Sequence, residues 1–326
     1  MIYDLAERIF MLDTSPRALA RSLPWPLREP AETAIDHIQH GAFQRSMAVL
    51  VAGTSIISGL EVAYEHYKGS YSNPVMYSPV ILSGVLATAA VAGLFSRIAT
   101  QTFLRYTSYI TLADGVIGFG FHVRGIARKP GGWRLPVTNI VMGPPIFAPL
   151  LFGTSAYLGV IASYLQREED FGLRGRAMGF LSPSRRNDFR NDIRTGRFQR
   201  HLCAVAALGT LASGAESWYS HYKDNFKYRV QWSPILLTPL MLIATLGARR
   251  SKLIANTLLP FASALLMLNG AIGVRYHLRG ILQRPGGKKK PLYNILYGPP
   301  IFAPMLFAAC GLLGMLAYFM RREPRR

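Results

Sequence analysis

Two groups of three residues share one spacing in distant parts of the chain. They are Glu61, His66 and His122 in the first half, and Glu216, His221 and His277 in the second. Imidazole nitrogens ligate haem iron and other transition metals, and a carboxylate near a membrane can carry protons or bind a cation. We therefore single out these six side chains for cofactor binding and proton handling.

The shared spacing belongs to an internal duplication. Residues 43–168 align with residues 198–323 without a gap, and more than a third of the aligned positions are identical. The run Gly-Pro-Pro-Ile-Phe-Ala-Pro at 143–149 returns unchanged at 298–304. Polar residues are retained at aligned positions of the two copies, whereas apolar residues differ. This pattern indicates that the polar positions carry the function.

Composition indicates a membrane protein. Half of the residues are hydrophobic although the formal net charge is +20. The charges are segregated from eight apolar stretches, most of them close to the roughly 20 residues that an α-helix needs to cross a bilayer. Helices satisfy their own backbone hydrogen bonds in lipid. The sequence therefore predicts an all-α integral membrane protein with eight transmembrane helices, arranged as two parallel tandem four-helix repeats.

Four regions follow from this arrangement. They are a cytoplasmic N-terminal region with an interfacial amphipathic helix (1–42), repeat 1 (43–168), a basic polar linker (169–197) and repeat 2 (198–323). With four helices per repeat, the linker and both termini share one side, which holds most of the Lys and Arg residues. The positive-inside rule predicts that this side is the cytoplasm. We expect the protein to lie in a bacterial inner membrane.

Glycines accompany the histidines at helical spacing. Gly59 lies two turns before His66, and Gly115 and Gly118 share a helix face with His122; repeat 2 keeps all of these residues. The first and third helices of an up-down-up-down bundle are diagonal, so their histidines would face each other across the core.

Two imidazoles above glycine-lined walls predict a bis-histidine haem b in each repeat, near the outer face. Arg124 and Arg279 would bind its propionates. Three other interpretations stay open: close helix packing at the glycines, a non-haem iron or zinc site made by one Glu and two His, and proton-handling or structural histidines. Glu61 and His66 are five positions apart, about 140° around a regular helix, so one metal ion could take both only if the helix unwound.

Asp114 lies in mid-span and aligns with Asn269. It could belong to a proton path present in repeat 1 alone, or make an interhelical hydrogen bond that Asp and Asn serve equally.

Tyr64 and Tyr219 lie one turn from the glutamates. Further aromatic residues at this level fit an interfacial belt or contacts to a quinone: Tyr67, Tyr77, Tyr222 and Trp232.

The function expected from these residues is that of a membrane redox subunit, part of an oxidoreductase, which passes electrons between an external donor and a quinone. Glu61, Glu216 and Asp114 would handle protons or orient ligands. The partners would be the lipid bilayer and a soluble or peripheral redox protein on the basic outer loops. A nucleic acid is not expected, because the basic residues are dispersed. The alternatives are a non-haem metal-dependent membrane enzyme and a small-molecule or ion transporter.

Overall fold

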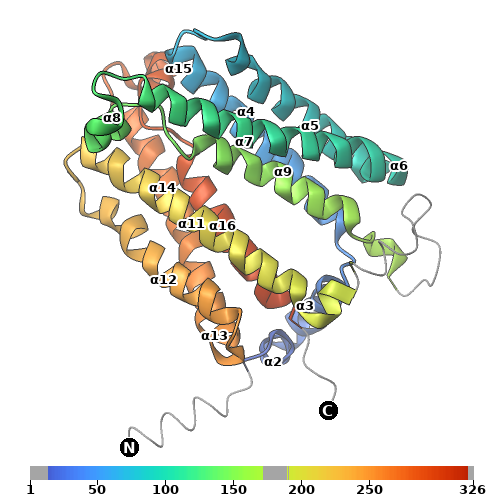
Figure 1. Ribbon diagram of the computed structural model, residues 1–326. Helices are drawn as coiled ribbons and strands as arrows, with labels where there is room; N and C mark the ends of the chain where they lie inside the picture. Colours follow the sequence, from blue (N-terminus) through green and yellow to red (C-terminus); the bar gives the residue numbers. More distant parts are fainter. Residues whose placement is uncertain (1–13, 172–188, 190, 322–326) are drawn as a thin grey trace, which may run out of the picture.

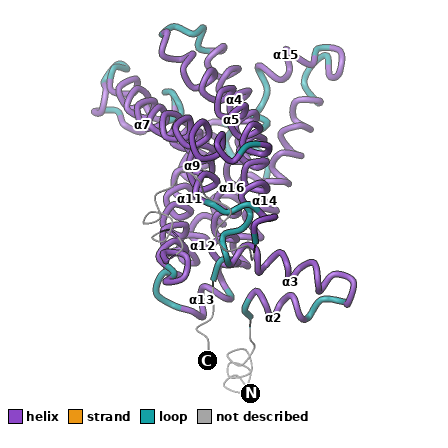
Figure 2. Tube along the Cα trace, turned by 90° about the vertical axis from the view of Figure 1, so that its right-hand side faces the viewer, coloured by secondary structure: helices purple, strands orange, loops and turns teal. Residues whose placement is uncertain are grey.

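The computed structural model describes residues 14–171, 189 and 191–321, and every regular element in these ranges is a helix (Figure 1, Figure 2). The interfacial helix expected near the start of the chain, around residues 2–10, lies outside the described residues, as does most of the linker 169–197. Between residues 14 and 42 the chain forms two further helices, α2 (Pro16–Arg21) and α3 (Trp25–Gln39).

Four long helices follow in the first half of the chain: α4 (Gln44–Lys68), α5 (Ser78–Phe95), α7 (Arg105–Ala127) and α9 (Ala148–Tyr164). Shorter elements connect or extend them: η1 (Pro74–Tyr77), α6 (Arg97–Ala99), the π-helical η2 (Thr100–Leu104), η3 (Gly132–Arg134), α8 (Pro136–Val141) and η4 (Glu168–Asp170).

The second half has four long helices at the corresponding alignment positions: α11 (Arg197–Lys223), α12 (Ser233–Ala248), α14 (Leu258–Leu282) and α16 (Ala303–Phe319). Its shorter elements are η5 (Arg229–Trp232), α13 (Lys252–Asn256), η6 (Gly287–Lys289) and α15 (Pro291–Leu296). The bounds of α8 and α15, and those of α9 and α16, correspond residue by residue.

The long helices pack in the same order in each half. Helix α4 packs on α5 and α9, and α7 packs on α5 and α9; in the second half α11 packs on α12 and α16, and α14 on the same two helices. Buried side chains from both halves, such as Leu86, Leu104, Met241 and Leu266, form one continuous hydrophobic core. In a membrane, such side chains stabilise the fold through close van der Waals packing between helices rather than through removal from water.

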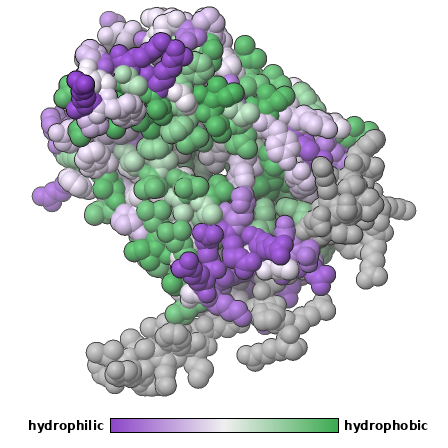
Figure 3. Space-filling model, viewed as in Figure 1, coloured by the Kyte–Doolittle hydropathy of each residue, from purple (hydrophilic) through white to green (hydrophobic). Residues whose placement is uncertain are grey.

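Five segments are long and apolar enough to cross a membrane: Gln44–Lys68, Pro74–Phe95, Ala148–Asp170, Arg229–Ala248 and Leu258–Leu282. A broad hydrophobic band lies between hydrophilic ends on the surface in view (Figure 3). The protein is therefore a helical protein with five candidate membrane spans. Helix α16 is apolar but shorter, and α7 and α11 are long but carry charged residues such as Asp114 and Glu216. The count of eight spans stays a prediction.

The two ends of the bundle differ. Helices α8 and α15 lie at the end where α4, α7, α11 and α14 finish, and we call this end the histidine end (Figure 1). Helices α2, α3 and α13 lie at the opposite end. The long loop after α7 is ordered, as its equal length in both halves predicts: Asn139 holds it through hydrogen bonds to the carbonyls of Pro130 (3.0 Å) and Gly132 (2.8 Å).

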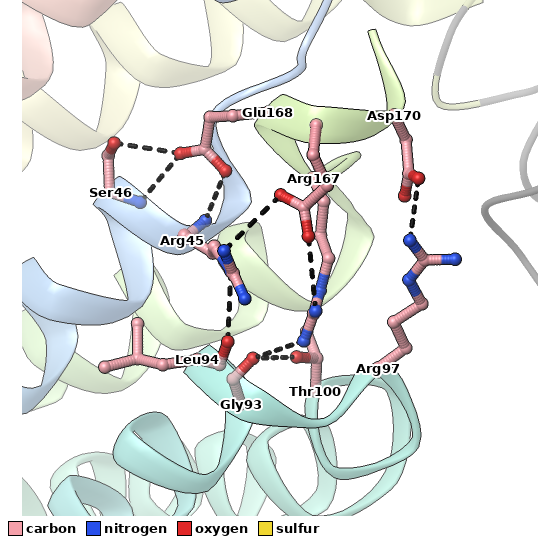
Figure 4. A network of polar contacts seen from close by, with 10 residues as sticks. Arg45, Ser46, Gly93, Leu94, Arg97, Thr100, Arg167, Glu168 and Asp170 are labelled. Carbon is pink, nitrogen blue, oxygen red and sulfur yellow. Dashed lines mark hydrogen bonds and ion pairs between the residues drawn. The ribbon is translucent and has the colours of Figure 1, made fainter. Parts of the chain in front are cut away.

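A polar network closes the opposite end of the first half (Figure 4). The Glu168 carboxylate accepts hydrogen bonds from the backbone N–H groups of Arg45 (3.0 Å) and Ser46 (2.9 Å), and so satisfies donors at the start of α4. Arg97 forms an ion pair of 2.7 Å with the buried Asp170. These contacts join the start of α4 and the short helix α6 to the segment that follows α9.

Candidate functional site

The histidine end brings together the four histidines that the sequence singles out. His66 and His221 lie in the last turns of α4 and α11, while His122 and His277 lie near the ends of α7 and α14. All four are partly buried. Each half contributes two histidines to this end, His66 and His122 in the first half and His221 and His277 in the second, and we call each two a histidine pair.

Three of these histidines have the same hydrogen-bond arrangement. The Nδ1 atom of His66 lies 2.7 Å from the Met76 carbonyl oxygen, and that of His122 lies 2.5 Å from the Pro145 carbonyl oxygen. In the second half, His277 Nδ1 bonds the carbonyl of Pro300. A carbonyl only accepts, so each Nδ1 is the donor, and in the neutral ring Nε2 is left with a free lone pair. This is the tautomer of a histidine that ligates a metal through Nε2.

A strained turn follows His66 at the end of α4, and another follows His221 at the end of α11. Ser70 and Tyr71 have φ angles of 57° and 44°, and at the aligned positions Asn225 and Phe226 have 51° and 48°. Positive φ is uncommon for non-glycine residues and introduces backbone strain, which is smallest for asparagine. The second residue of each turn donates its N–H back to the histidine carbonyl at 3.0 Å, from Tyr71 to His66 and from Phe226 to His221.

Each turn ends in a stacked aromatic pair. Tyr71 stacks on Tyr77, and Phe226 on Trp232, both with ring centroids 4.2 Å apart. The Tyr71 hydroxyl donates to the Ala63 carbonyl at 2.9 Å. Partial burial, with a smaller effect from Tyr77, raises the pKa of Tyr71, so this phenol stays a donor. Sequence reasoning missed these turns. Two adjacent positive-φ residues leave little sequence signal beyond an asparagine at 225.

The glycine faces do not line an open cavity. A Cβ atom on Gly115 would lie 2.8 Å from the Pro149 carbonyl oxygen, and one on Gly118 would lie 3.1 Å from Pro149 Cβ. Gly270 and Gly273 meet Pro304 in the same way, at 2.7 Å from its carbonyl oxygen and from its Cβ. The prediction of free walls for a macrocycle beneath the histidines is therefore wrong. The first turns of α9 and α16 fill this space, as the alternative of close helix packing predicts.

The two glutamates make hydrogen bonds with residues other than the histidines. Glu216 Oε1 accepts hydrogen bonds from the backbone N–H groups of Phe147 (3.2 Å) and Ala148 (3.1 Å) and from the Tyr219 hydroxyl (2.9 Å). The first two donors begin α9, so a carboxylate of the second half caps a helix of the first. Among the described residues, Glu61 accepts a hydrogen bond from Tyr64 alone, at 3.4 Å.

No group of three or more His, Cys, Asp or Glu side chains in the described ranges could hold a metal ion. Glu61, His66 and His122 therefore do not form the three-ligand iron or zinc site considered above. The free cysteines Cys203 and Cys310 are buried within α11 and α16.

Asp114 and Asn269 make equivalent contacts. The Ser78 hydroxyl donates to Asp114 Oδ1 at 2.7 Å, and Asn269 Nδ2 donates to the Ser233 hydroxyl at 2.6 Å. The contact links α7 to α5 in one half and α14 to α12 in the other. An interhelical bond thus accounts for the residue without a proton path.

Arg124 and Arg279 are exposed at the histidine end, near the ends of α7 and α14. Neither forms an ion pair with a described residue. Both are therefore available to an external anion.

The chain matches no known family model, no characterised protein and no solved structure.

Proposed function

We propose that the protein is a membrane redox subunit of two parallel four-helix repeats, in which each histidine pair holds a metal-containing cofactor. One observation supports this most directly: His66, His122 and His277 all commit Nδ1 to a backbone carbonyl and leave Nε2 uncommitted. Carbonyl tethers of this kind fix the orientation and basicity of ligating imidazoles. In each half the two ligands would come from two different helices, α4 and α7 or α11 and α14.

A haem b is the cofactor that two facing imidazoles suit best. Because the first turns of α9 and α16 fill the glycine faces, the histidine side chains would hold the group without a contribution from these faces. Arg124 and Arg279 would then reach its propionates. A transition-metal ion held by the two Nε2 atoms and solvent is the alternative. The three-ligand enzyme is less favoured, because Glu61 does not join the histidines.

The proposal includes a topology. Eight helices would cross a bacterial inner membrane, with both termini in the cytoplasm and the histidine end at the outer face. The basic residues of the histidine end, among them Lys288, Lys289 and Lys290, would face a soluble or peripheral electron donor. A transporter with its site between the repeats is less favoured, since Glu216 at that contact is committed to the start of α9.

Absorption spectroscopy and metal analysis of the purified full-length protein test the cofactor. The haem form predicts a Soret band that shifts on reduction, with two haems per chain. His122→Ala and His277→Ala should each remove about half of the pigment, and the double variant nearly all of it. Metal without pigment would support the alternative cofactor.

His201→Ala is the matched control. His201 also lies in a long helix, α11, but its ring packs 5.7 Å from the Tyr157 ring and belongs to neither pair. Thermal unfolding should show that all variants remain folded. A protein that binds neither haem nor a transition metal would contradict the proposal, as would equal losses in His201→Ala and His122→Ala.

A further inference from the structure

A pocket of about 370 Å³ opens at the histidine end, between the turn that follows α4 and the segment that follows α15. Its lining comes from both halves of the chain: Tyr67, Lys68, Ser70, Tyr71, Tyr77 and Tyr297. Four of these six residues are tyrosines, so aromatic faces and phenol hydroxyls dominate the site.

The pocket offers hydrogen-bond donors that the protein does not use itself. The Tyr71 hydroxyl already donates a hydrogen bond to the Ala63 carbonyl oxygen. The hydroxyls of Tyr67, Tyr77 and Tyr297 make no hydrogen bond within the described part of the chain, and these residues are 58%, 50% and 53% exposed. A ligand that carries acceptors and a flat ring would use both the free hydroxyls and the aromatic faces.

Charge argues against an anionic ligand. The pocket has one cation, Lys68, and its Nζ atom lies 2.8 Å from Glu65 Oε1. The same ammonium lies 5.3 Å from the centre of the Tyr64 ring. A phosphate group calls for several unpaired positive charges or a cluster of backbone N–H groups. A neutral ligand with carbonyl oxygens fits this balance better.

The other half of the chain provides an internal comparison. The positions aligned with Tyr71, Tyr77 and Tyr297 hold Phe226, Trp232 and Met142. Stacked aromatic faces thus occur in both halves, but all three phenol hydroxyls occur in the first site only. An interfacial aromatic belt would not require this difference, because Phe and Trp also anchor to a membrane surface. The hydroxyls are therefore better explained by a ligand.

We propose that this tyrosine pocket binds the ring of a quinone, with Tyr67, Tyr77 and Tyr297 donating to its carbonyl oxygens. A quinone has a flat neutral ring, two acceptors and no donor in its oxidised form. The inference rests on the proposed function, because a membrane quinone is the electron carrier that this function requires. The binding itself needs no metal or haem, so it can be measured separately.

Calorimetric titration of the full-length protein in detergent with a short-chain benzoquinone tests the site. We expect saturable binding at one site per chain. Tyr67→Phe and Tyr297→Phe each remove one donor and keep the ring, and each should weaken binding by about three- to tenfold. Tyr222→Phe is the matched control, because Tyr222 aligns with Tyr67, is 50% exposed and lies outside the pocket.

Three results would overturn the proposal: no saturable binding, equal weakening by Tyr222→Phe and Tyr67→Phe, or displacement of the quinone by inorganic phosphate. The double variant His122→Ala/His277→Ala separates the two proposals, because it should remove nearly all of the cofactor and leave quinone binding intact. If the unmodified protein binds the quinone but purifies with neither metal nor haem, the pocket is supported and the proposed function is contradicted. If the protein binds metal or haem but no quinone, the proposed function is supported and the quinone site is contradicted.

Discussion

Two glutamates at equivalent alignment positions make different contacts. Glu216 accepts three hydrogen bonds and caps α9, whereas Glu61 accepts one long bond from Tyr64. The sequence shows both residues as retained acids near a helix end, which is why a proton-handling role is a reasonable expectation. It cannot show which backbone N–H groups each carboxylate meets, because that depends on how the halves pack.

Glu216→Ala should destabilise the protein by about 1–2 kcal/mol, because it removes a helix cap and leaves two N–H groups without their acceptor. Glu61→Ala should cost less than about 1 kcal/mol, since the bond to Tyr64 is long. Unfolding in the same detergent measures both values. Equal losses in the two variants would show that Glu216 has no special capping role.

Asp114→Asn should leave stability within about 0.5 kcal/mol of the parent protein, because Asn269 shows that an amide serves the same contact. Asp114→Leu should cost about 1 kcal/mol or more, since Ser78 then loses its partner on α7. The same unfolding assay compares them. A large loss of redox activity in a stable Asp114→Asn variant would instead point to a proton-carrying acid.

At the scale of elements, the sequence predicts the helices well and their contacts only in part. Apolar runs bounded by charges mark the long helices, and the equal loops predict ordered segments with Asn139 and Asn294 at fixed places. Glycines at helical spacing have two interpretations, a ligand wall or a close contact. The pattern alone does not distinguish them. The structure does, because Pro149 and Pro304 occupy the space beside the glycines.

Gly115→Ala should destabilise the protein by about 1–3 kcal/mol, because the new methyl group would push α9 away from α7. Gly120→Ala is a control on the same helix: a Cβ there meets nothing within 4 Å. Alanine should stabilise a helix at such a position by up to about 1 kcal/mol. Similar losses at the two positions would show that the close contact at Gly115 does not exist.

The positive-φ turns are the elements that the sequence hides best. Ser70→Gly should stabilise the protein, by about 0.5–1 kcal/mol, since glycine adopts this backbone without steric cost. Asn225→Gly should gain less, because asparagine tolerates the left-handed region. Thermal unfolding of the two variants measures the difference. A loss of stability in Ser70→Gly would mean that the turn is held by the serine side chain.

At the scale of the whole molecule, the arrangement of the two ends makes a topological prediction. Cysteines introduced at the exposed positions Lys288 and Arg194 should react with a membrane-impermeant maleimide from opposite sides of the membrane. The natural Cys203 and Cys310 are 3% and 1% exposed, so the background should be low. Labelling of both introduced cysteines from one side would contradict the proposed orientation of the helices.

Composition and charge were enough to predict a helical membrane protein, because lipid admits few other backbones. The contact between the halves was not predictable, since few residues make it and the apolar pattern is the same on all sides of a membrane helix.

The cap on α9 has a consequence for the origin of the chain. A polypeptide of half this length would leave the first N–H groups of its last helix without the acceptor that Glu216 supplies to α9. Two such polypeptides could complete each other if a glutamate of one capped the last helix of the other, whereas in the present chain Glu61 bonds Tyr64 instead. Joining them in one gene would make that association independent of concentration, and would free each copy to lose what the other keeps.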